Sequence, residues 1–307
     1  MTTMRARKLS VAEMQAAIEA AWRGEFADAH GGQGDSRRGQ VPQAGPPSAP
    51  AARRATLGTG GPAGGGRPGA DARPLPGPTV LVLAAHAGAG ASTVALLLAD
   101  TLAATGTATR LIECADPSRS GIAAATDTEL GEDPSGWRRG RRGHLEINRP
   151  CQPLAALDDL PAPRPVAPPA TGPAVTVVDA GWPAGDVLTA DSWPTHLITT
   201  ALVVVACRAT VPGARQVEQL LATLPARVAL VAALGPTKWP GVVSASCGSQ
   251  IRAMRASGHL VAVPVDRHLD VTGLTANRLP KQLATAGRDL AERLLPDLST
   301  TRQRRAG

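Results

Sequence analysis

Short apolar runs alternate with helical patterns along the chain from residue 79 onward. The first run, 80–85, leads into a loop of small residues, and a second run with Ala95, Leu97 and Leu98 follows at helical spacing. Further strands are expected at 108–114, 145–148, 174–179, within 197–206, and at 228–234 and 260–265, and helices at 213–224, 249–257 and 280–295. Residues 118–131 are expected to be partly helical, 137–144 to form a basic insert and 150–173 a surface loop. This order predicts an α/β fold with a doubly wound, mostly parallel sheet covered on both faces.

The loop between the first two runs has the small residues of a phosphate-binding loop. In the pattern GxxxxGK[ST], Ala85 stands at the first glycine, Gly90 at the second and Ser92 at the hydroxyl position, while Ala91 replaces the lysine. A strand, a glycine-rich turn and a helix start direct main-chain N–H groups at an anion. The alternative is a tight turn with no ligand, in which Ser92 and Thr93 only cap the helix.

The loop resembles that of the ParA/MinD partition ATPases, whose form is KGGxGK[ST]T. On that form, His86 takes the place of the first lysine and Ala91 that of the second, so both lysines are missing. The segment 111–117, LIECADP, resembles the acidic motif that follows the family's second strand, with Asp116 at its second acidic position and Cys114 at the first. Asp179, which ends the run VTVVD, stands where the family has its Walker-B aspartate, and 263–266, VPVD, resembles the segment beside the nucleotide base.

The resemblance implies a P-loop domain of the SIMIBI type over roughly 79–295, with a site for ATP and Mg²⁺. The implied catalytic residues are Asp116 and Asp179. The implied nucleotide-binding residues are His86, Gly88, Gly90, Ala91, Ser92, Thr93, Pro264 and Asp266, and the implied magnesium-binding residues are Ser92 and Asp179. From the residues alone, Asp116 before Pro117 is also a common strand-to-turn pair.

An amphipathic helix is expected near the N-terminus. Val11, Met14, Ile18 and Trp22 share one face of 9–26, and the stretch 30–78 is rich in Gly and Pro. We therefore expect a helix in 1–28, a disordered linker at 29–78, the P-loop domain at 79–298 and a basic tail at 299–307. The helix is expected to dock on a protein partner through that face, with packing on its own domain as the alternative.

Charge and composition narrow the class of protein. The net charge of +7 is concentrated in the N-terminal segment, the 138–142 run and the C-terminal arginines, so nucleic-acid contact would involve these arginines. The four cysteines show no metal-binding spacing. No signal peptide or transmembrane run is evident, which predicts a cytoplasmic protein.

The missing lysines decide the functional expectation. A loop lysine neutralises phosphate charge, so its loss predicts weak or absent binding of ATP and Mg²⁺ and little or no hydrolysis. We expect a degenerate P-loop protein that acts as an adaptor or regulator in a partition-like or mobile-element maintenance system, with a nucleotide-dependent homodimer as one mode of action. The alternative is an active ATPase that positions DNA or a protein machine, in which Arg119, Arg208 or Arg215 substitutes for the lysine.

Overall fold

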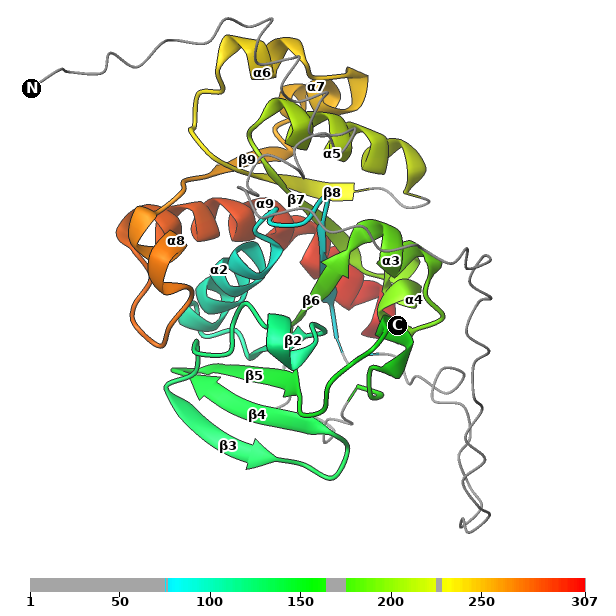
Figure 1. Ribbon diagram of the computed structural model, residues 1–307, viewed down its shortest axis with the longest axis vertical. Helices are drawn as coiled ribbons and strands as arrows, with labels where there is room; N and C mark the ends of the chain where they lie inside the picture. The colour runs from blue at the N-terminus through cyan, green and yellow to red at the C-terminus, as the bar shows by residue number, and fades with distance from the viewer. Residues whose placement is uncertain (1–74, 76, 164–174, 225–227, 307) are drawn as a thin grey trace, which may run out of the picture. The chain divides into compact units, whose positions relative to one another are not determined.

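A nine-stranded sheet forms the centre of the structure. The computed structural model describes residues 75, 77–163, 175–224 and 228–306. In this part of the chain the strand order is β3-β4-β5-β2-β6-β1-β7-β8-β9, and β4 runs antiparallel to both of its neighbours while the other pairs are parallel (Figure 1). The strands are β1 (Thr79–Ala84), β2 (Thr109–Glu113), β3 (Thr128–Glu132), β4 (Trp137–Arg142), β5 (Leu145–Pro150), β6 (Val175–Pro183), β7 (Leu202–Arg208), β8 (Val228–Leu234) and β9 (Leu260–Val263).

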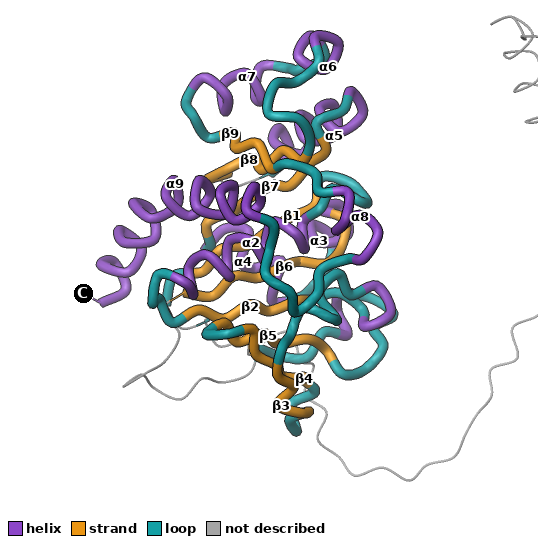
Figure 2. Tube along the Cα trace, turned by 90° about the vertical axis from the view of Figure 1, so that its left-hand side faces the viewer, coloured by secondary structure: helices purple, strands orange, loops and turns teal. Residues whose placement is uncertain are grey.

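Helices cover both faces of this sheet (Figure 2). One hydrophobic cluster joins the sheet to α2 and α9, and a second joins the opposite face to α3, α4, α5, α6 and α7. The helices are α2 (Ala91–Ala104), α3 (Ala184–Thr189), α4 (Trp193–Thr200), α5 (Val211–Thr223), α6 (Gly241–Ala245), α7 (Ser249–Ala256), α8 (Arg267–Thr272) and α9 (Lys281–Ala306), with 3₁₀ turns at Pro117–Arg119 and Leu157–Asp159. The sheet is therefore the middle layer of a three-layer α/β fold.

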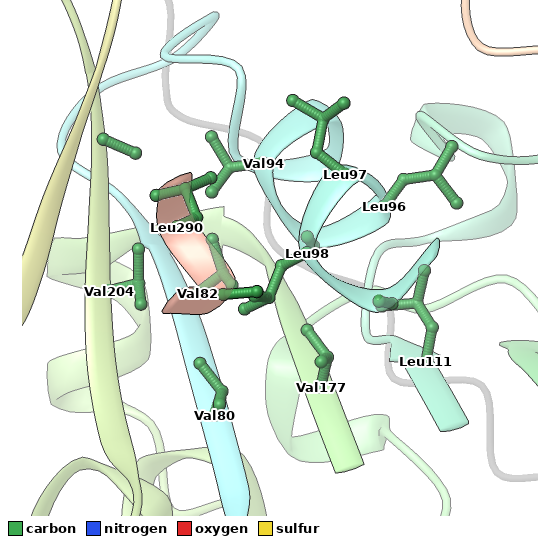
Figure 3. Packing of buried hydrophobic residues seen from close by; sticks show 14 of the residues in the cluster. Val80, Val82, Val94, Leu96, Leu97, Leu98, Leu111, Val177, Val204 and Leu290 are labelled. Atoms are coloured by element: carbon green, nitrogen blue, oxygen red, sulfur yellow. The ribbon is translucent and has the colours of Figure 1, made fainter. Parts of the chain in front are cut away.

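Helix α2 is the most deeply buried helix of the first cluster. Leu96, Leu97 and Leu98 are fully buried because the helix packs both on the sheet and against α9 (Figure 3). At Gly287 of α9 an added Cβ would lie 2.9 Å from the Leu97 carbonyl oxygen, so a glycine allows the two helices to approach this closely. This packing fixes the start of α2 at the carboxyl end of β1.

The predicted fold class is confirmed. The expected strands correspond to β1, β2, β5, β6, β7, β8 and β9, and the expected helices to α2, α5, α7 and α9. Some local predictions differ. Helices α3, α4, α6 and α8 were not expected, α9 continues past 295 to Ala306, and the 118–131 segment has only the Pro117–Arg119 turn before β3 begins. Here sheet pairing overrides weak helical propensity.

The segment 137–144 was expected as a basic insert, and its residues Trp137–Arg142 instead form strand β4. Trp137, Gly140 and Arg142 are buried, while Arg138 and Arg141 are exposed. Buried and exposed positions cannot be told apart by composition when both are arginine. The run is therefore part of the folded sheet.

The predictions for 1–28 and most of 29–78 lie outside the described residues. Leu75, at the end of the predicted linker, is buried in the second hydrophobic cluster. Within the described part of the chain, no helix combines the length and the apolar character needed to cross a bilayer.

Candidate functional site

The loop between β1 and α2 has the backbone shape of an anion-binding turn. Gly88 and Gly90 have φ values of +71° and +86°, in the left-handed region. The Ala89 N–H donates to the His86 carbonyl at 3.1 Å, which closes the turn. By helix geometry the first N–H groups of α2 have no partner within the helix, so the loop and the helix start present donors on the same side.

Gly90 is held tightly in this loop. It is the N-cap of α2 in the left-handed conformation, and the helix receives no side-chain cap. An added Cβ at Gly90 would lie 2.1 Å from Leu234 Cδ2, whereas one at Gly88 would meet nothing within 4 Å. The loop therefore rests against the end of β8, and only a glycine fits at this contact.

His86 connects the loop to the end of β7. Its Nε2 accepts a hydrogen bond from the Arg208 N–H at 3.1 Å, and its Nδ1 lies 2.8 Å from the Ala87 carbonyl oxygen. Because a carbonyl can only accept and an N–H can only donate, these contacts fit a neutral ring with its proton on Nδ1. His86, at the first lysine position, thus joins the loop to the end of β7 by a hydrogen bond within the protein.

Asp179 lies fully buried beneath the start of α2. Its Oδ1 accepts from the Gly181 N–H at 3.1 Å. Burial raises the pKa of Asp179, and hydrogen bonds from the Ser92 hydroxyl and the Gly181 N–H oppose the rise. Among the described residues, Asp179 Oδ2 has no partner in ordinary hydrogen-bond geometry. A buried carboxylate oxygen next to a hydroxyl is a donor set that suits Mg²⁺.

Glu113 is a second buried carboxylate, which the sequence analysis missed. It pairs in register with Asp179 across strands β2 and β6. Burial, followed by the charge of Asp179, raises the pKa of Glu113 to about 7. The Ser120 hydroxyl donates to Oε2 at 2.5 Å and the Gly121 N–H to Oε1 at 2.8 Å. The signal that could have identified it was a glutamate at the end of a strand, directly after the apolar Leu111 and Ile112.

A cavity of about 340 Å³ opens at the carboxyl ends of the central strands. The structure brings these sequence-predicted residues together along it: His86, Gly88, Gly90, Ala91, Ser92, Thr93, Asp179, Pro264 and Asp266. Within the described residues, Arg208 is the lining arginine and no lysine lines the cavity, while Asp179, Asp266 and Asp270 contribute carboxylates. The cavity is thus in the place where open α/β sheets bind ligands but carries an acidic balance.

Asp116 is not part of this cavity lining. Its Oδ1 accepts from the Ser118 N–H at 2.9 Å, and its Oδ2 accepts from the Leu154 N–H at 2.6 Å. Hydrogen bonds from Ser118 and Leu154 lower the pKa of Asp116. Both oxygens are engaged in holding the chain after β2, which is the structural role that its position before a proline also suggested.

Trp182 forms a wall of the cavity that the sequence analysis did not identify. Its Nε1 donates to the Cys114 carbonyl at 2.8 Å, and the Arg119 guanidinium lies 4.1 Å from the centroid of its ring. Arg119 is thus stacked on an aromatic face. Of the three arginines considered as substitutes for the lysine, Arg208 is the one that lines the cavity.

The arginines of β4 are largely used within the fold. Arg138 pairs with Glu132 at 2.6 Å and Arg139 with Glu146 at 3.6 Å, while Arg142 is buried. Paired arginines offer less charge to a phosphate backbone, so this run gives little support to a nucleic-acid surface.

Comparisons with known proteins point to one group of folds. No protein-family model and no curated protein matches the sequence. The structure matches the MinC:MinD cell division complex of Aquifex aeolicus with 16% identity, over 71% of this chain and 96% of that chain, at a TM-score of 0.47. It matches the septum site-determining protein MinD of Pyrococcus horikoshii, complexed with Mg-ADP, with 12% identity, over 73% of this chain and 98% of that chain, at a TM-score of 0.47. A plasmid partition protein from Borrelia burgdorferi matches with 10% identity, over 72% of this chain and 99% of that chain, at a TM-score of 0.39. The chain is thus similar to ParA/MinD-type partition and cell-division proteins.

Proposed function

We propose that this chain is a phosphate-loop protein with a degenerate nucleotide site, acting as an adaptor or regulator in a partition-like or mobile-element maintenance system. One observation carries the proposal: Ala91 begins α2 at the position of the loop lysine, in a cavity whose described lining has more carboxylates than cations. A loop lysine neutralises phosphate charge in the ground state and in the transition state. Without it the scaffold of a nucleotide switch remains, but the charge that drives turnover does not.

The remaining donors fit a magnesium ion better than they fit a polyphosphate. Asp179 Oδ2 and the Ser92 hydroxyl would hold Mg²⁺, and a bound ion would neutralise phosphate oxygens. A polyphosphate, however, would bring negative charge next to Asp266 and Asp270 with Arg208 as the lining cation. The expected result is weak binding of Mg-nucleotide through main-chain donors, with little or no hydrolysis.

Restoring the lysine tests this proposal directly. Calorimetric titration with Mg-ATP and Mg-ADP should show weak or undetectable binding to the natural chain and at least about tenfold tighter binding to Ala91→Lys, because a charge-assisted contact of about 1.5–3 kcal/mol is regained. Ala87→Lys is the matched control, since it adds the same charge at an exposed lining position and should give a smaller gain.

An active ATPase is the second candidate function, and the placement of Arg208 at the cavity favours it. In that case Arg208 would replace the lysine as the phosphate cation. Turnover above about 1 per minute, abolished by Asp179→Ala and by Arg208→Ala, would establish this candidate and remove the degenerate site. The same assay on Arg215→Ala, an exposed arginine of α5, controls for loss of charge.

The adaptor role rests on the N-terminal helix predicted from sequence. Substituting Ile18 and Trp22 by Ala in the full chain should abolish recovery of a protein partner if that helix is the docking element, because both belong to its apolar face. Equal recovery of the partner protein with the variant and with the natural chain would mean that the partner binds another part of the chain. Sedimentation with and without Mg-ATP tests the nucleotide-dependent homodimer.

A further inference from the structure

Among the residues that the structure describes, strand β9 forms an open edge of the sheet. It is the last strand in the sheet order, and it lies between α7 and α9 in both views (Figures 1 and 2). A cavity of about 810 Å³ follows this edge, which we call the β9 groove; Leu260, Val261, Ala262 and Pro264 line it. It is larger than the cavity at the phosphate loop.

The main chain of β9 directs hydrogen-bonding groups into the open side. The His259 carbonyl accepts from Val231 at 2.8 Å and the Val263 carbonyl from Gly235 at 2.9 Å, so these residues direct their carbonyls toward β8. Main-chain groups of a strand alternate in direction, and those of Leu260 and Ala262 therefore point away from β8. An exposed row of this kind is a template for another strand.

Two walls, one from α9 and one from α6, α7 and the loop before α6, turn this edge into a groove. One wall is a single face of α9, with Gln282, Ala286, Asp289 and Arg293 at helical spacing. The other wall comprises Lys238, Trp239, Ser244 of α6 and Arg255 of α7. An extended chain can pair with the outward main-chain groups of β9, whereas the main-chain groups of a helix are already paired within the helix.

Trp239 supplies an independent sign of a ligand. Its side chain is only 6% exposed, and its Nε1 has no hydrogen-bond partner among the described residues. A buried indole N–H usually finds an acceptor. The Arg255 guanidinium lies 4.5 Å from the centroid of the Trp239 ring, so the missing acceptor would lie beside a cation.

The charge of the β9 groove selects the type of ligand. Lys238, Arg255 and Arg293 line it, against the single carboxylate of Asp289 in the described lining. A basic wall with an indole donor favours a chain that carries carboxylates. The chain's own residues 1–78 hold ten Arg and Lys against six Asp and Glu. Their net charge is positive, like that of the groove, which disfavours them as its ligand.

We propose that the β9 groove binds an extended acidic segment of a partner protein, which adds to the sheet as a strand beside β9. Main-chain groups of Leu260 and Ala262 pair with the segment, Trp239 Nε1 donates to one of its acceptors, and Lys238, Arg255 and Arg293 attract its carboxylates. This surface is separate from the phosphate-loop chemistry, so the proposal stands or fails independently of nucleotide binding.

The test is a selection of short random peptides displayed on phage against the full chain, with Ala262→Pro as the counter-selecting protein. Proline removes the outward N–H without removing a bond to β8, which edge strands tolerate. The enriched peptides should be acidic and free of proline. The tightest one, labelled with fluorescein, should bind at least about tenfold more weakly to Ala262→Pro and Trp239→Phe than to the natural chain. Ala262→Thr, which keeps the N–H, should bind it normally.

Charge reversal provides a second readout if the proline variant does not fold. Arg255→Glu should weaken binding of the same peptide at least about tenfold, whereas Arg215→Glu on the exposed face of α5 should leave it unchanged. Failure to enrich acidic peptides, or equal binding to all variants, would overturn the proposal. So would full competition by an oligothymidylate that binds Ala262→Pro as well as the natural chain, because that would assign the groove to nucleic acid.

Discussion

Glu113 and Asp179 lie directly opposite each other on the neighbouring parallel strands β2 and β6, and both are fully buried. Two carboxylates in this position cannot both ionise without repulsion in a poorly solvated site. Cys114, at the first acidic position of the motif that the segment 111–117 resembles, belongs to the hydrophobic cluster on the other face of the sheet. The carboxyl group opposite Asp179 therefore belongs to Glu113, one residue before Cys114.

The first prediction concerns the pH dependence of stability. The pKa of Glu113 rises from 4.5 to about 7 in the folded protein, mainly through burial. A carboxyl with a raised pKa holds its proton more tightly when folded, so its contribution to the free energy of unfolding is fully present below about pH 4.5 and is lost as pH rises through 7. The free energy of unfolding of Glu113→Gln, measured in urea relative to that of the natural chain, should therefore rise by on the order of 3 kcal/mol between pH 5 and pH 8.

The matched control for Glu113 is Glu292→Gln, at an exposed position of α9. The free energy of unfolding of this control, relative to that of the natural chain, should not change with pH. If the corresponding difference for Glu113→Gln is also independent of pH, Glu113 ionises normally in the folded protein.

Asp116 should act on stability and leave nucleotide binding untouched. Asp116→Ala removes the acceptors for the Ser118 and Leu154 N–H groups and should lower the melting temperature by roughly 2–6 °C. Calorimetric affinity for Mg-ADP, measured on Ala91→Lys with and without the substitution, should be the same. A selective loss of affinity at unchanged stability would instead give Asp116 the role that the family resemblance implied.

Arg142 should be an anchor of the β3–β5 edge. Its guanidinium donates to Asp100 Oδ1 at 3.1 Å and to the carbonyls of Thr275 and Asn277 at 2.7 and 2.8 Å. Arg142→Met leaves these acceptors without their buried cation and should cost about 2–4 kcal/mol in the free energy of unfolding. Arg141→Met, one residue away on the exposed face, should change it by less than about 0.5 kcal/mol. Equal effects would remove the anchoring role.

The two loop glycines should differ in their tolerance of alanine. Gly88→Ala adds only left-handed backbone strain, about 1–2 kcal/mol, since the space around it is open. Gly90→Ala adds the same strain and a clash with Leu234, so it should cost about 1–3 kcal/mol more. Thermal melting of both variants measures the difference, and a Gly88→Ala cost equal to that of Gly90→Ala would show that Leu234 moves aside freely.

The candidate site was predicted in part by local pattern. The loop from His86 to Thr93 and the strand ending at Asp179 are contiguous segments whose composition favours one local structure, so their presence at the same end of the sheet follows from parallel strand order. Asp116 shares the same kind of sequence signal, yet its carboxylate is held by the N–H of Leu154, which lies 38 residues further along the chain. No local pattern contains such a partner.

By itself the sequence determined the alternation of strands and helices, the place of the glycine loop and the absence of its lysines, because each depends on residues close together along the chain. Only the tertiary structure decided that 138–142 pairs as a strand, that Glu113 faces Asp179, that His86 braces Arg208, and that β9 leaves a basic groove open. The physical reason is that these features depend on which face of a strand points inward and on contacts between distant segments, and both are set by packing of the whole sheet.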